Sequence, residues 1–103
     1  MDVLARIKQC ALLHQVRFTL KPSEERFADE LSELEILESL VNATRIEKTI
    51  RSTAPRGKRR EYLYVIKSPT AAGELVYTKG KLVNEQGLLV YYLLISAKLS
   101  NDS

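Results

Sequence analysis

Cysteine and histidine each occur once in this chain of 103 residues, as Cys10 and His14. A single cysteine excludes an internal disulfide framework and a cysteine metal cluster. With one histidine, a zinc site would need carboxylates for nearly all of its ligands, which is an uncommon ligand set. We therefore expect no metal and no other cofactor, and we assign Cys10 to the core as a small buried hydrophobe.

Long apolar runs are also missing. No segment approaches the roughly 18 apolar residues of a membrane span, and the N-terminus lacks the basic, apolar and small-residue series of a signal peptide. No phosphate-binding glycine loop and no nucleophile elbow occurs. Hydrophobic residues make up 45% of the chain and charged residues 28%, as in a folded globular domain. We expect a cytoplasmic protein with no membrane partner.

The charge is unevenly distributed along the chain, although the net charge is only +3. Between Pro22 and Leu40 there are seven acids against the single base Arg26. Between Arg45 and Lys67 there are eight bases against two acids. A basic half is suited to a polyanion such as nucleic acid. The alternative is a solvated basic loop beside an oppositely charged helix.

Apolar spacing and capping residues predict helices in the first half of the chain. Residues 2–15 repeat apolar side chains at three- and four-residue spacing, and Pro22 fits the first turn of a second helix that reaches about Leu31. Ser32 and Glu35 have the spacing of a capping box, which begins a third helix. We expect Asn42 to end that helix in a left-handed conformation. Residues 16–20 alternate and predict a short extended piece.

After Thr44 the apolar period changes from 3.6 to 2, which predicts four strands over residues 45–52, 61–67, 74–83 and 88–99. Their short links favour antiparallel hairpins. The predicted fold class is α+β, with N-terminal helices packed on one face of a four-stranded antiparallel sheet. We expect one domain over residues 1–103, with a helical part over about 2–42, the sheet over about 45–99 and a frayed tail at 100–103.

Strand alternation predicts which side chains share a face. In the third predicted strand these are Leu75, Tyr77, Lys79 and Lys81, with Gly80 marking a bulge. One face of the last strand is fully apolar, and we expect it to be the helix-covered core: Leu89, Tyr91, Leu93, Ile95 and Ala97. The other face is mixed, as an exposed functional surface would be: Val90, Tyr92, Leu94, Ser96 and Lys98.

Lysine and tyrosine on an exposed sheet face can cleave RNA by activating its own 2′-hydroxyl against the neighbouring phosphate. The reaction needs a base, an acid for the leaving oxygen and cations for the developing negative charge. The alternative is that these are ordinary sheet residues, since tyrosine is common in strands and lysine at their ends. For RNA binding we select five cations that would contact phosphates without choosing bases: Arg51, Arg56, Lys58, Arg59 and Lys79.

Three strand segments carry a resemblance to a known family: residues 46–52 (IEKTIRS), 75–79 (LVYTK) and 94–98 (LISAK). With them, residues 18–98 resemble the RelE/ParE-like bacterial toxin superfamily. The chain is especially similar to the MqsR-type mRNA interferases and to a related domain-of-unknown-function family. The resemblance implies a RelE/MqsR-like fold and an active surface that includes Lys48, Tyr77 and Lys98.

Three functions follow as hypotheses. The first is a metal-independent endoribonuclease toxin that cleaves single-stranded RNA and is restrained by an antitoxin protein. The second is a noncatalytic RNA-binding or regulatory module of the same fold. The third is a structural partner protein whose exposed sheet face pairs with another subunit, including a second copy in a homodimer.

Overall fold

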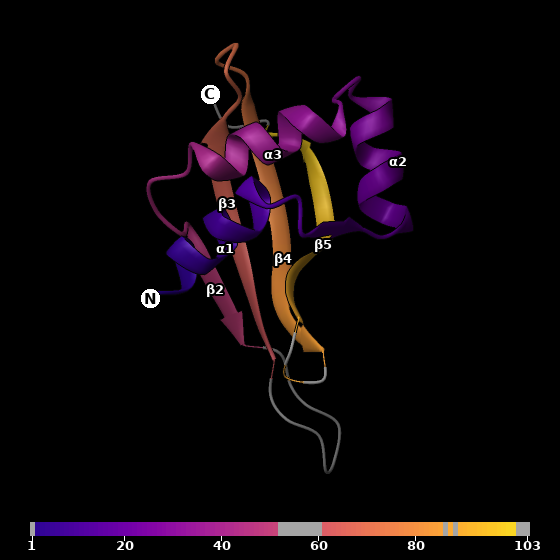
Figure 1. The fold of residues 1–103 in the computed structure, drawn as a ribbon. Helices are drawn as coiled ribbons and strands as arrows, with labels where there is room; N and C mark the ends of the chain where they lie inside the picture. The colour runs from indigo at the N-terminus through magenta and orange to yellow at the C-terminus, as the bar shows by residue number, and fades with distance from the viewer. Residues whose placement is uncertain (1, 52–60, 86, 88, 101–103) are drawn as a thin grey trace.

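The computed structural model describes residues 2–51, 61–85, 87, 89–100, and the chain forms three helices and five strands within them (Figure 1). The helices are α1 (Val3–Leu12), α2 (Leu20–Ala28) and α3 (Glu33–Val41). The strands are β1 (Val16–Phe18), β2 (Lys48–Arg51), β3 (Tyr62–Pro69), β4 (Leu75–Glu85) and β5 (Leu89–Leu99). The broad α+β prediction is therefore confirmed.

Helix α1 begins where Asp2 accepts a hydrogen bond from the Ala5 amide at 2.7 Å, which satisfies a donor that the first turn leaves free. The helix ends at Leu12, three residues before the predicted end, and His14 then adopts a φ of 55°. Its inward face buries Ile7, Cys10 and Ala11.

Helix α3 begins with the predicted capping box. The Ser32 hydroxyl accepts from the Glu35 amide at 3.1 Å, and the Glu35 carboxylate accepts from the Ser32 amide at 3.0 Å. The helix ends at Val41 with Asn42 as its C-cap, as predicted, but the predicted left-handed conformation is wrong, because Asn42 has a φ of −79° and keeps a right-handed backbone. Its side-chain amide instead donates to the Pro69 carbonyl at 3.0 Å, which ties the end of α3 to β3.

The sheet has the strand order β1-β5-β4-β3-β2, and the neighbours among β2 to β5 run antiparallel. The prediction of a four-stranded antiparallel sheet is wrong in one respect. The extended piece β1 joins the sheet as a fifth strand and pairs with β5 in parallel, so the sheet is mixed. Alternation over three residues predicts an extended piece but not its partner, since β1 and β5 are separated by most of the chain.

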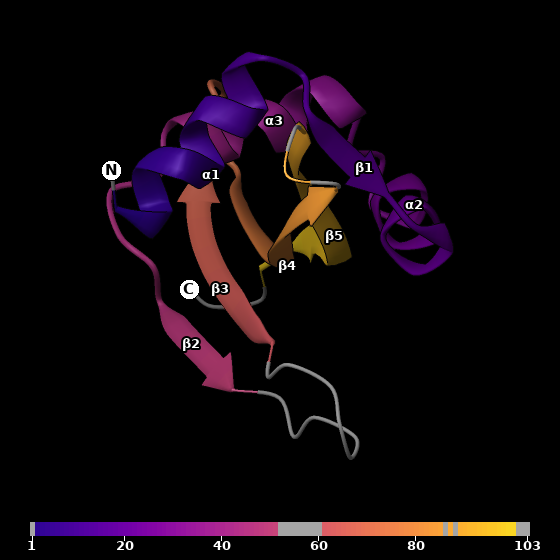
Figure 2. The ribbon, with the colours of Figure 1, turned by 60° about the horizontal axis from the view of Figure 1, so that its bottom comes forward.

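Helices α1 and α3 cover one face of the sheet (Figure 2), whereas α2 packs along the edge of β5 beyond the end of β1. The prediction that all helices lie on one face is therefore only partly correct. Two carboxylates bind the β5 backbone beyond the end of β1. Glu25 of α2 accepts from the Ala97 amide at 3.1 Å, and Asp29, the C-cap of α2, accepts from the Leu99 amide at 2.8 Å. The unpaired amides of an exposed strand edge can pair with another chain and promote aggregation. Glu25 and Asp29 accept hydrogen bonds from two of these amides in β5.

A β-bulge decides which residues of β5 enter the core. Lys79 pairs with Ser96 and Gly80 pairs with Leu94, so Ile95 has no partner in β4. Because of this additional residue, the prediction for the upstream part of β5 is wrong: Tyr92 and Leu94, assigned to the exposed face, are fully buried under the helices. Downstream of the bulge, Ala97 lies in the core as predicted.

The core is shared by both halves of the chain. Helix residues such as Ile36 and Leu40 pack with strand residues such as Ile66 and Val76 in one buried cluster. No helix among the described residues is long and apolar enough to cross a membrane.

Candidate nucleic-acid interface

The face of the sheet that α1 and α3 leave uncovered, called the open face below, carries most of the basic strand residues. Residues paired across antiparallel strands point to the same face. One row of pairs runs from Lys48 through Val65 and Lys79 to Ser96, and the next runs from Lys67 through Tyr77 to Lys98. Since Tyr77 and Lys79 are two residues apart in β4, both rows lie on the same face.

Tyr77 and Lys98 are direct register partners on this face, near the start of β4 and the end of β5. The Lys98 Nζ lies 5.5 Å from the centroid of the Tyr77 ring, within the range of a cation–π interaction. The same Nζ lies 3.8 Å from a Glu25 carboxylate oxygen. Glu25 is itself held by the Ser96 hydroxyl, which donates to it at 2.8 Å. Lys98 is therefore oriented by a carboxylate on α2 and by an aromatic ring on β4.

Lys48 shares the open face but not the immediate surroundings of this pair. It lies in β2, two strands from Tyr77 and three from Lys98, or about 10 and 15 Å across the sheet at the usual strand spacing. It is exposed on an edge strand, where lysine is common because its charge prevents edge-to-edge pairing. Lys48 thus lies on the same face as Tyr77 and Lys98 but does not converge with them on one point of the sheet.

Two of these lysines have no carboxylate partner within the described part of the chain, namely Lys48 and Lys79. Val65, which lies between them in the register, is only 5% exposed although no helix covers it. We infer that the aliphatic stems of flanking side chains shield it while the ammonium groups remain in solvent. Such an arrangement presents positive charge above an apolar floor.

Other cations on the open face were not selected from the sequence. Arg17 lies on β1 with its guanidinium carbon 3.8 Å from the centroid of the Tyr91 ring. Lys67 pairs in register with Tyr77, and Lys81 forms an ion pair with Glu61 at 3.0 Å. Alternation had already placed Lys81 on the face of Tyr77 and Lys79 and could have found Lys67 in β3, but Arg17 required knowledge that β1 joins the sheet.

The cations selected from the sequence for RNA binding fall into three groups. Lys79 lies on the open face. Arg51 lies three positions after Lys48 in β2 and pairs with Tyr62, so it points to the opposite face. Arg56, Lys58 and Arg59 lie outside the described residues.

Acidic and metal-binding side chains are sparse around this face. Within the described residues, no three His, Cys, Asp or Glu side chains gather closely enough to hold a metal ion. The only carboxylates for which an ion pair with an open-face lysine is described are Glu25 and Glu61. The described ion pairs therefore leave the open face with more lysines than paired carboxylates, among apolar strand residues such as Ile50, Leu63 and Leu93.

No protein-family model matches this chain, and no curated protein and no solved structure shows significant similarity to it. The resemblance to the RelE/ParE-like superfamily stays a prediction from the three strand segments.

Proposed function

We propose that the open face binds the backbone of single-stranded RNA and that Tyr77 and Lys98 act on one of its phosphodiesters. The single observation that carries the proposal is the register, in which Tyr77, Lys79 and Lys98 occupy adjacent positions on an uncovered sheet face. Lysines offer ion pairs to phosphates, and aromatic rings on a sheet face offer stacking surfaces to bases. The protein would act in the cytoplasm as an endoribonuclease toxin restrained by an antitoxin.

The binding step is electrostatic. Four open-face lysines lie in two adjacent register rows, at positions 48, 67, 79 and 98. Each phosphate neutralised on a single strand contributes about −0.7 to the slope of log affinity against log salt concentration. Four such contacts give a slope of log affinity against log salt concentration of about −3.

The chemical step is transfer of the phosphate to the neighbouring 2′-hydroxyl. A bond forms between the 2′-oxygen and phosphorus while the bond from phosphorus to the 5′-oxygen breaks. A lysine takes the 2′-hydroxyl proton, Tyr77 orients the phosphate or donates a proton to the leaving 5′-oxygen, and the remaining cations stabilise the developing charge. The products are a 2′,3′-cyclic phosphate and a 5′-hydroxyl.

A noncatalytic RNA-binding module is the second candidate, and one contact favours it. Glu25 lies 3.8 Å from the Lys98 Nζ, so part of the charge that a phosphorane would need is already neutralised. In that case the open face holds RNA without cleaving it. The two candidates share the binding surface and differ in whether Lys98 is engaged by Glu25 or by the substrate.

Incubation of the purified protein with end-labelled single-stranded RNA, followed by analysis of the product ends, separates the candidates. The endoribonuclease predicts cyclic-phosphate ends and a loss of about 10²–10⁴-fold in rate for Lys98→Ala and for Tyr77→Phe. In bacteria, induced expression should arrest growth, and Lys98→Ala should relieve the arrest. Binding without any cleavage supports the noncatalytic module. Absence of binding at low salt contradicts both.

A further inference from the structure

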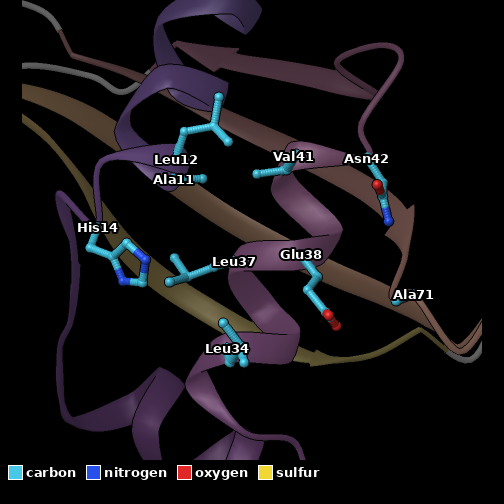
Figure 3. A pocket seen from close by; sticks show the side chains of 9 residues that line it. All are labelled: Ala11, Leu12, His14, Leu34, Leu37, Glu38, Val41, Asn42 and Ala71. Atoms are coloured by element: carbon cyan, nitrogen blue, oxygen red, sulfur yellow. The ribbon is translucent and has the colours of Figure 1, made fainter.

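On the helical side of the molecule, a groove of about 290 Å³ runs between the end of α1 and the outer surface of α3 (Figure 3). Leu12 lines it from α1, and Leu34, Leu37 and Val41 line it from α3. Figure 3 shows Leu12 and Val41 on opposite walls of the groove, with Leu34 further along it. The groove lies on the helix layer, away from the open face of the sheet.

Two leucines in the walls of this groove are largely exposed. Leu12 is 64% exposed and Leu34 is 60% exposed. Helix α3 buries Ile36, Leu37 and Leu40. Beside the buried Leu37, the exposed Leu34 and the partly buried Val41 continue an apolar stripe along the same side of the helix. Residues three and seven positions apart lie on one side of a helix. A stripe of this kind opposite a second helix has the shape that an amphipathic helix recognises.

The acidic residues beside the groove indicate which charge a bound partner helix should carry. Helix α3 contains three acids and no base in its sequence ELEILESLV. Glu33 pairs with Arg26 at 3.2 Å and Glu35 is used in the capping box. Glu38 lines the groove and has no cation partner among the residues that the structure describes. A partner helix that buries Glu38 would need to offer it a lysine or arginine.

We propose that this groove binds an amphipathic helix of another protein, with an apolar stripe against Leu12, Leu34 and Val41 and a basic residue against Glu38. The proposal does not depend on RNA binding, because it uses the opposite side of the molecule and the opposite sign of charge.

A second copy of this chain fits the groove poorly. A two-fold contact between grooves would bring the acidic α3 helices of both copies into one interface, and like charges at an interface oppose association. Helix α2 does expose Leu20 and Phe27, but Glu24 lies between them at helical spacing and would approach Glu38. Head-to-tail docking of α2 would form rings or open chains of copies and not a two-fold dimer.

The test uses the whole protein and a fluorescent synthetic peptide of about 18 residues. The peptide is helical, carries leucines along one side and lysines beside them, and binding is measured by anisotropy. We expect saturable binding that Leu34→Ser weakens by about fivefold or more. The matched control Phe27→Ser removes an 80% exposed apolar side chain outside the groove and should leave the affinity unchanged. Circular dichroism melting establishes that each variant is folded.

Charge reversal completes the test. Glu38→Lys should lower the affinity for the lysine peptide by about two- to fivefold. The same variant should bind a glutamate version of the peptide more tightly than the wild type does. The open face contributes equally to both proteins, so it cancels in this comparison. The proposal is overturned by the absence of saturable binding, by binding that Leu34→Ser leaves intact, or by equal losses in Leu34→Ser and Phe27→Ser.

Discussion

Substitution of Gly80 by alanine tests the packing that determines both sheet faces. A Cβ atom at this position would lie 2.7 Å from the Leu93 carbonyl oxygen, 2.7 Å from the Tyr92 Cζ and 2.9 Å from its Cε2. Favourable contacts between carbon atoms are about 3.5–4.0 Å. The carbonyl belongs to the backbone of β5, and Tyr92 is fully buried with its hydroxyl donating to the Tyr64 carbonyl at 3.3 Å. Neither neighbour can retreat without distorting the bulge.

Overpacking of a close-packed core lowers the free energy of unfolding by about 1–3 kcal/mol. Because one of the short contacts is with the backbone, we expect Gly80→Ala to lose about 3 kcal/mol. For a domain of this size that lowers the melting temperature by roughly 12–24 °C. The assay is thermal unfolding followed by circular dichroism.

Gly73→Ala is the matched control for this prediction. Gly73 has a φ of 89° and nothing within 4 Å of an added Cβ. Its alanine variant should therefore lose about 1 kcal/mol of stability, from the strain of a side chain on a left-handed backbone alone. Addition of Tyr92→Leu to Gly80→Ala removes the ring, and the double variant should lose less than the sum of the single variants. Equal losses in Gly80→Ala and Gly73→Ala would refute the reasoning.

Three further predictions concern local interactions. Ser32→Ala removes the capping bond to Glu35 and should lower the free energy of unfolding by about 1 kcal/mol in urea titrations; an unchanged midpoint would contradict the role of the cap. Burial raises the pKa of Tyr92 above its ordinary value, so the unfolded state ionises first and stability should fall by up to about 1.4 kcal/mol per pH unit above about pH 10. Tyr92→Phe should remove this part of the slope, and parallel curves for both proteins would argue against it. Burial also raises the pKa of the Cys10 thiol, so alkylation at pH 8 should be slow until the protein unfolds; a rate equal to that of a free thiol would show that Cys10 is accessible.

Local signals in the sequence predicted most of the elements. The capping box at Ser32 depends on residues three apart, and the change of period after Thr44 depends on neighbouring side chains, so both are visible without knowledge of the fold. Gly80 was also recognisable as a bulge site, since a glycine inside a strand often marks one. The structure has the register shift between Lys79 and Gly80.

The errors came from contacts between distant parts of the chain. The pairing of β1 with β5 depends on residues more than 70 positions apart, and no local pattern specifies it. The face of Tyr92 was misassigned because the bulge adds its residue to β5 at Ile95, not to β4 where the glycine lies. The role of Glu25 could not be foreseen either, because it depends on α2 lying along the β5 edge.

The same division applies to the candidate site. Alternation correctly grouped Tyr77 with Lys79 in β4, and the register adds Lys98 beside Tyr77. Alternation within β2 could not show how far Lys48 lies from this pair, since that distance depends on the strand order. The excess of bases in the second half of the chain led to the selection of Arg51, which the pairing with Tyr62 directs to the other face.

The most direct test of RNA binding at the open face is the salt dependence of affinity in two charge-matched variants. Lys79→Gln removes one cation from the open face, and Arg6→Gln removes one from the exposed side of α1. Affinity for labelled single-stranded RNA is measured by anisotropy over a range of salt concentrations. We predict a slope of about −3 for the wild type and for Arg6→Gln, and a slope of about −2 for Lys79→Gln. Equal slopes in the two variants, or no binding at low salt, would contradict the assignment of this face to RNA.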